Sequence, residues 1–141
     1  MRSSSRKLLL PDTNVLVYET VEDSSHHIEA AELIDSAGEI LVVPIVLHEY
    51  MWVMIRKLGV PAGFVAAKIS EYLGDPRTRY VAEPLGVINK ALGLLEKGYM
   101  QPRELNDAII LATAIQYSAV LATLDQRLRR KAKQLGVPVK P

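Results

Sequence analysis

The sequence predicts an α/β protein in which a mostly parallel sheet carries helices on both of its faces. Short apolar or β-branched runs, typical of buried strands, alternate along the chain with longer segments whose apolar residues recur at helical spacing. Glycine or proline stands at most boundaries between these segments. The 141 residues suffice for one core and leave no room for a second, so we expect residues 1–141 to form a single domain.

The first half of the chain supplies two strands and the helices around them. Leu8-Leu9-Leu10 is a short apolar run, and Ile40 to Val43 is a continuous aliphatic run, so both read as buried strands. Apolar positions at helical spacing and closing glycines mark the helices between and after them. The expected elements are a strand at 7–11, helices at 13–18 and 26–37, a strand at 39–43, and helices at 45–58 and 61–73.

The second half continues the alternation of strands and helices. The segment 77–82 is partly polar, which places its strand near an edge of the sheet. Pro84 and Gly98 bracket the next helix, and the run Ala119 to Thr123 reads as another strand. The expected elements are strands at 77–82, 119–123 and 137–139, and helices at 84–97, 103–117 and 125–135.

Composition excludes several classes of protein. The chain has no cysteine, so disulfides and thiolate chemistry are absent, and its three histidines do not have the spacing of a zinc site. The formal net charge of +1 gives no global attraction to nucleic acid or membrane. The basic segment 1–7 is followed by only three leucines, too few for a signal peptide, and no apolar run approaches a membrane span of about 20 residues. We therefore expect a cytoplasmic protein.

Four acids stand where an acid is costly. Asp12 and Asp125 each follow an apolar strand, whereas Glu49 and Asp107 lie in helices that are apolar over most of their circumference. Each acid also has an ordinary structural role that would explain it without a functional site. Asp12 and Asp125 could be helix N-caps, Asp107 could complement a helix dipole, and Glu49 could pair with an arginine. In an α/β fold, however, all four can converge beyond the carboxyl ends of the strands, where ligands bind.

Four clustered carboxylates repel one another in a poorly solvated site unless a cation compensates their charge. An oxygen-rich set of ligands without histidine suits Mg²⁺ or Mn²⁺. A metal ion held in this way can activate water for attack on phosphorus. The four acids are therefore candidate metal ligands and catalytic residues.

The order of these residues resembles the PIN domain, and more narrowly the VapC-type toxin ribonucleases of toxin–antitoxin pairs. The resemblance covers nearly the whole chain and is carried by Asp12-Thr13-Asn14, Glu49, Asn106-Asp107-Ala108 and Thr123-Leu124-Asp125. It implies a small three-layer α/β/α sandwich with a four- or five-stranded sheet. The sequence departs from the family pattern at Pro11, where an apolar residue is usual, and at the start of the helix at 45–58, which lacks a Ser or Thr.

The resemblance also implies an activity and a set of partners. Asp12, Glu49, Asp107 and Asp125 would bind Mg²⁺ or Mn²⁺ in an endoribonuclease, with Asn14 and Thr123 supporting Asp12. The expected partners are RNA, a second copy of the chain and an antitoxin. The helices at 45–58 and 61–73 carry more apolar side chains than one sheet face can cover, which favours an interaction surface there.

RNA would need positive charge near this acidic site. Arg127 and Arg129 in the helix after Asp125 are the candidate RNA contacts. Trp52 and several tyrosines could stack bases, but a helical tryptophan is more often a core residue.

Other classes of protein put an aspartate after the first strand. A haloacid-dehalogenase-type phosphatase needs a second aspartate two residues later, where this chain has Asn14. A receiver domain needs a lysine after a late strand, and Thr123-Leu124-Asp125 offers none. A PIN-type RNA-processing nuclease outside any toxin pair, and a PIN fold that only binds RNA or protein, remain alternatives.

Overall fold

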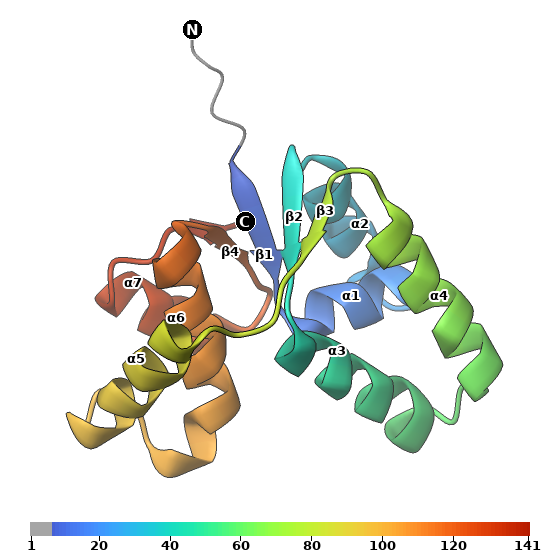
Figure 1. The fold of residues 1–141 in the computed structure, drawn as a ribbon. Helices are drawn as coiled ribbons and strands as arrows, with labels where there is room; N and C mark the ends of the chain where they lie inside the picture. The colour runs from blue at the N-terminus through green and yellow to red at the C-terminus, as the bar shows by residue number, and fades with distance from the viewer. Residues whose placement is uncertain (1–6) are drawn as a thin grey trace, which may run out of the picture.

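Five parallel strands form a central sheet in the order β3-β2-β1-β4-β5 (Figure 1). The protein is described from a computed structural model over residues 7–141. The parallel sheet confirms the predicted α/β class. The strands are β1 (Leu8–Pro11), β2 (Glu39–Val42), β3 (Thr78–Tyr80), β4 (Val120–Ala122) and β5 (Val139–Lys140).

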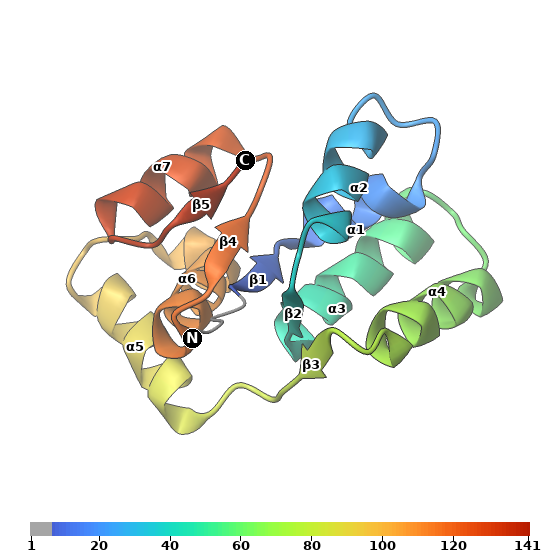
Figure 2. The same ribbon diagram turned by 90° about the horizontal axis from the view of Figure 1, so that it is seen from above.

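Helices cover both faces of the sheet and complete three layers (Figure 2). One face is covered by α1 (Thr13–Thr20), α2 (His27–Asp35), α3 (Pro44–Met51) and α4 (Ala62–Gly74). The other is covered by α5 (Leu85–Glu96), α6 (Leu105–Tyr117) and α7 (Gln126–Gln134). None of the helices in residues 7–141 is long and apolar enough to cross a membrane.

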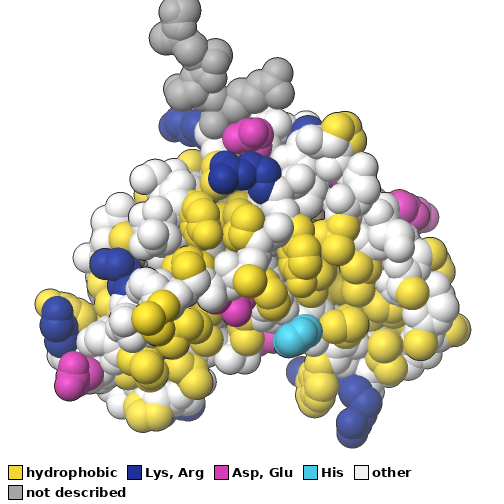
Figure 3. Space-filling model, viewed as in Figure 1, with side chains coloured by type: hydrophobic (Ala, Val, Ile, Leu, Met, Phe, Trp, Pro, Cys, Tyr) yellow, Lys and Arg dark blue, Asp and Glu magenta, His cyan; other side chains and the backbone are white. Residues whose placement is uncertain are grey.

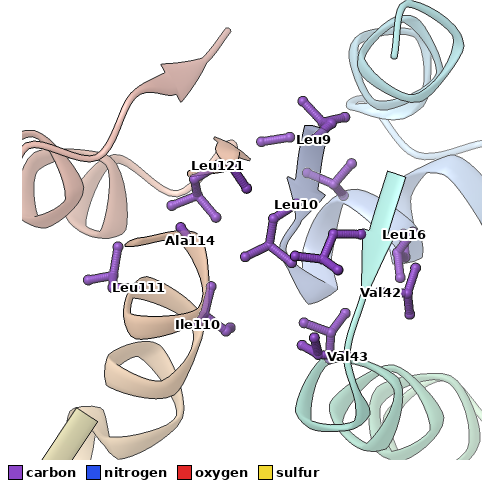
Figure 4. Close-up of a cluster of buried hydrophobic side chains, with 14 of the residues drawn as sticks. Leu9, Leu10, Leu16, Val42, Val43, Ile110, Leu111, Ala114 and Leu121 are labelled. Carbon is purple, nitrogen blue, oxygen red and sulfur yellow. The ribbon is translucent and has the colours of Figure 1, made fainter. Parts of the chain in front are cut away.

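The apolar runs of the strands form the core between these layers. Leu10 of β1 and Leu121 of β4 are fully buried, and they face Ile110 and Leu111 of α6 on one side of the sheet (Figure 4). Leu16 of α1 lies on the other side. Burial of so much aliphatic surface, at about 25 cal/mol per Å², is the main term that stabilises the fold. This core fixes the two strands that end at the candidate site.

The strand boundaries agree with the sequence predictions to within about two residues. The partly polar strand predicted at 77–82 is β3, an edge strand as expected, although only three of its residues pair. The last strand forms at Val139–Lys140, slightly later than predicted. The helix predicted at 103–117 begins with a 3₁₀ turn at Pro102–Glu104.

The helix predicted at 45–58 differs from expectation in two ways. It is α-helical only to Met51 and continues as a π-helix over Trp52–Lys57. It also buries only one face, chiefly Val46, Leu47, Tyr50 and Met54, although it is apolar over most of its circumference and would on that ground be expected to be largely buried. Apolar residues on its other face, including Trp52, have no neighbouring layer to cover them.

Pro11 does not disturb the sheet. β1 pairs with β2 only at Leu8 and Leu9, so the pairing on that side has already ended at Pro11. On the other side the Asp12 N–H donates to the Ala122 carbonyl at 3.0 Å. Since successive N–H groups of a strand point to opposite sides, the missing donor of Pro11 falls where no partner strand remains.

The absence of Ser or Thr at the start of α3 is also explained. Val43 occupies the N-cap position and provides no side-chain acceptor. Instead, the Glu83 carboxylate, which follows β3, accepts the Ile45 N–H at 3.2 Å. An acid supplied from another element therefore satisfies a free donor of the first turn, as an N-cap residue would.

Candidate active site

The site lies where the order of the strands reverses. The chain adds β2 on one side of β1 and later adds β4 on the other, which opens a crevice at the carboxyl ends of β1 and β4. Pro11 is in register with Ala122. The next residues, Asp12 and Thr123, therefore emerge side by side from the edge of the sheet.

Asp12 is buried and fully engaged by hydrogen bonds. Its side chain is one of the few polar ones in the core, with only 5% of the residue exposed. The Thr123 hydroxyl donates to Asp12 Oδ2 at 2.5 Å, and the Val15 N–H donates to Oδ1 at 3.1 Å. Asp12 is thus the N-cap of α1, as its ordinary reading predicted, and Thr123 supports it as the resemblance implied.

Glu49 is held from two sides by residues that are distant in sequence. The Thr13 hydroxyl donates to Glu49 Oε1 at 3.0 Å, and the Asn106 amide donates to Oε2 at 2.9 Å. These bonds fix a carboxylate of α3 against α1 and the first turn of α6. Asp107, also in the first turn of α6, lies next to Asn106 and is partly buried.

Asp125 closes the site from the start of α7. Its Oδ1 accepts the N–H groups of Arg127 at 2.8 Å and Leu128 at 3.2 Å, so it is the N-cap of α7. Its own N–H donates to the Thr123 hydroxyl oxygen at 3.0 Å. Thr123 therefore connects Asp12 to Asp125, because its hydroxyl donates to one and accepts from the backbone of the other.

All four acids line one small pocket of about 140 Å³. Figure 3 shows acidic side chains in a hollow between two hydrophobic areas of the surface. The acids reach the pocket from four places: the ends of β1 and β4, α3 and α6. The full lining is Asp12, Thr13, Asn14, Glu49, Val53, Asp107, Ile110, Asp125 and Leu128.

Two of the carboxyls have raised pKa values. Burial raises the pKa of Asp12 to about 6, with smaller contributions from Asp125 and Asp107, although the hydrogen bonds from Thr123 and Val15 oppose the shift. Burial also raises the pKa of Asp107 to about 6, followed by repulsion from Glu49 and Asp125. Both carboxyls are therefore harder to ionise than a solvent-exposed aspartate, chiefly because they are buried.

The pocket suits a hard divalent cation by the chemistry of its side chains. Its four carboxylates offer oxygen ligands alone, which favours Mg²⁺ or Mn²⁺, and such a cation would relieve their repulsion. Within residues 7–141, however, no three acidic, histidine or cysteine side chains are placed as a ready-made ion site. Oxygens of Asp12, Glu49 and Asp125 accept hydrogen bonds from the protein. Some of the acidic side chains would therefore have to rotate before they could share one ion.

The other candidate residues divide into those near the pocket and those turned away. Asn14 lines the pocket and is exposed, but over the described part of the chain its side chain makes no hydrogen bond with Asp12. It is the second residue of α1, and its support of Asp12 stays a prediction. Thr13 and Asn106 provide support that the analysis of the sequence did not assign, although both adjoin a predicted acid.

The two candidate arginines have different surroundings. The Arg127 side chain is 61% exposed, forms an ion pair with Glu104 at 3.2 Å, and favours the charged form of Asp107. Arg129 is turned away from the pocket: its guanidinium donates to the carbonyls of Pro141 and Thr123. Arg129 therefore joins the strand ends, and its role as an RNA contact stays a prediction.

Comparison with known proteins identifies the family. The model of the PIN domain family matches residues 9–134, and the chain belongs to that family. No curated protein shows significant sequence similarity to it.

Solved structures share the fold across nearly all of the chain. The Mycobacterium tuberculosis toxin VapC20, described as cleaving the sarcin–ricin loop, has a TM-score of 0.73 at 16% identity, covering 86% of this chain and 93% of that one. VapBC2 of Rickettsia felis, solved with a DNA fragment from its promoter, has a TM-score of 0.67 at 20% identity, covering 94% and 97%. A toxin–antitoxin complex from Klebsiella pneumoniae has a TM-score of 0.60 at 21% identity, covering 84% and 88%.

The raised pKa values predict how stability depends on pH in the metal-free protein. Folded Asp12 and Asp107 bind protons more tightly than the unfolded chain does, so their stabilising contribution is full below pH 4 and is lost as pH rises through about 6. For buried Asp12 the loss is on the order of 2 to 3 kcal/mol, and for Asp107 it is smaller. Urea denaturation in EDTA from pH 4 to 8 measures it.

The matched variant for this experiment is Asp12→Asn, which keeps an acceptor for the Val15 N–H but cannot titrate. The free energy of unfolding of the native protein should fall relative to that of the variant between about pH 4 and 6 and level off above that. Parallel curves for the two proteins would show that Asp12 does not titrate in this range.

Proposed function

We propose that the chain is a metal-dependent endoribonuclease and the toxin of a type II toxin–antitoxin pair. The observation that carries the proposal is the convergence of Asp12, Glu49, Asp107 and Asp125 on one pocket at the carboxyl ends of β1 and β4. Membership of the PIN domain family and the likeness to VapC toxins support it.

The four acids would hold Mg²⁺ or Mn²⁺. When bound, such an ion supplies an activated water for attack on a phosphodiester and offsets negative charge at phosphorus. The chain's own groups set the geometry. Thr123 and the Val15 N–H orient Asp12, and Thr13 and Asn106 orient Glu49. Supporting hydrogen bonds of this kind keep ligating carboxylates in place.

The RNA would reach the acidic pocket past Arg127. This side chain is exposed in the first turn of α7, between the pocket residues Asp125 and Leu128, and its present partner is the mostly buried carboxylate of Glu104. Exchange of Glu104 for a phosphate would keep the guanidinium paired, because arginine binds carboxylate and phosphate with the same fork of donors. Arg127 would therefore contribute to RNA affinity and to its salt dependence.

The first test replaces one acid. Asp12→Asn should abolish Mn²⁺-dependent cleavage of RNA, a loss of at least a hundredfold in kcat, while circular dichroism and Tm show a folded protein. Asp23→Asn removes an equal charge from an exposed turn outside the pocket and should cleave at the native rate. Native activity in Asp12→Asn would refute the assignment of the site. Absence of cleavage in the native protein, with no stabilisation by Mn²⁺, would indicate a binding module.

We also propose that the protein is a homodimer that binds a cognate antitoxin. Ile55 of the π-helix, Leu58 just after it and Phe64 of α4 remain 37%, 50% and 54% exposed, as the excess of apolar residues in these helices predicted. Large apolar side chains left exposed on one segment of the chain favour contact with another protein. A neighbouring gene for a small DNA-binding protein would support the antitoxin.

Light scattering after size exclusion tests the dimer. At micromolar concentration the protein should elute at twice the mass of the chain, since exposed apolar side chains are covered on association. A monomer at this concentration would contradict the proposal without affecting the assignment of the acidic pocket.

A further inference from the structure

A second groove adjoins the acidic pocket. Its volume is about 480 Å³, within the range of small-ligand sites. It shares Glu49 and Val53 with the acidic pocket, so the two are continuous. The remaining lining residues are Ile45, His48, Trp52, Lys57 and Asn106.

Trp52 is the prominent side chain of this groove. It lies three residues after Glu49 and therefore on the same side of the helix. It is 52% exposed, although burial of so large an apolar surface would stabilise the fold. Val46, Leu47, Tyr50 and Met54 pack on the core side of this segment, so the backbone keeps the indole directed away from the core.

The π-helix places a positive charge beside the indole. In a regular α-helix Lys57 would lie about 140° around the axis from Trp52, because five residues turn through about 500°. The wider turn of the π-helix, marked by the Leu58 N–H donating to the Val53 carbonyl at 3.0 Å, brings these two residues onto one side. Lys57 Nζ lies 5.6 Å from the centroid of the Trp52 ring.

We propose that this groove binds one unpaired nucleotide of the RNA substrate, with its base stacked on Trp52 and its phosphate near Lys57. The proposal rests on the proposed nuclease function, because the groove opens beside the pocket that would cut the chain. An aromatic face next to a cation is the combination that binds single-stranded nucleic acid, and stacking accepts any base. Asn106 adds an exposed amide that can bond to a base or ribose.

RNA fits this groove better than a second protein chain does. Charged or polar groups form much of its lining, including His48, Glu49 and Lys57. The centres of protein interfaces are depleted in lysine and glutamate. Trp52 is therefore assigned to the substrate, whereas Ile55, Leu58 and Phe64 remain the surface proposed for association.

The single tryptophan of the chain provides a direct readout. In Asp12→Asn, which should not cleave, oligoadenylate RNA is expected to quench the Trp52 fluorescence. An abasic oligomer of the same length has the same phosphates but no bases, and it should leave the fluorescence unchanged. Equal quenching by both oligomers would overturn the proposal.

Substitution of Trp52 then tests its contribution. With binding followed by the anisotropy of a fluorescently labelled oligoadenylate, Trp52→Ala should weaken binding about 5- to 100-fold, and Trp52→Phe should restore most of the affinity. In the active protein Trp52→Ala should raise KM with little change in kcat, at an unchanged Tm. Tyr80→Ala removes an aromatic ring of similar exposure from the edge strand β3 and should have no effect.

The outcomes separate this proposal from the nuclease assignment. If Trp52→Ala has the same KM and the same RNA affinity as the unmodified protein, the proposal of a nucleotide site is wrong. Cleavage by the unmodified protein would still support the nuclease function in that case. Base-dependent quenching together with weaker oligoadenylate binding by Trp52→Ala, in a protein that cuts no RNA, would support the nucleotide site and contradict the nuclease. If Trp52→Ala converts a dimer into a monomer, the groove faces a second copy of the chain and the proposal is wrong.

Discussion

The hydrogen bond from Thr123 to Asp12 is the contact on which the site depends. It joins two residues that are 111 positions apart, and it forms because β1 and β4 are paired in parallel with Pro11 opposite Ala122. A shift of one residue in that register would turn one of the two side chains to the opposite face of the sheet. The buried leucines of both strands oppose such a shift, so the core determines where the first carboxylate lies.

The same arrangement concentrates negative charge that the fold alone does not neutralise. Asp12 and Asp107 both titrate at about 6, since burial and the neighbouring acids disfavour their charged forms. Because this repulsion and burial destabilise the folded state, a cation that binds the folded protein but not the unfolded chain would raise the free energy of unfolding. The raised pKa values are therefore consequences of one cluster of acids, and the proposed metal ion would relieve the same repulsion. Thr123 supports Asp12 in this cluster, and Thr13 and Asn106 support Glu49.

The sequence was sufficient to predict the order of the elements and the convergence of the four acids on one place. The role of these acids as metal ligands stays a prediction. Asp12 and Asp125 were recognisable because each follows an apolar run, and Glu49 and Asp107 because each interrupts an apolar helix. The partners of these acids were less accessible. Thr13 reaches Glu49 across 36 residues, and periodicity carries no information on contacts between elements. Asn14, which looked equally suitable, is exposed at the pocket and makes no hydrogen bond with Asp12 in the described residues.

The exposure of Trp52 could not be predicted from the sequence for a related reason. The excess of apolar side chains predicted an exposed surface on this segment but not which residues form it. Only the tertiary structure shows that the side carrying Trp52 has no covering layer. The π-helical turn has no recognised pattern of residues, yet it aligns Lys57 with the indole. Arg129 was similarly ambiguous, because a basic residue after an acid can face substrate or the end of a neighbouring strand.

The most direct test of the central claim, that four carboxylates make one cation site, is a crystal structure of the protein soaked with Mn²⁺. Anomalous scattering locates this ion without ambiguity. We predict an ion in the pocket, bound by Asp12 and by at least two of Glu49, Asp107 and Asp125, with Thr123 still donating to Asp12. Mn²⁺ bound elsewhere, or absent from the pocket when all four carboxylates are ionised, would contradict the claim.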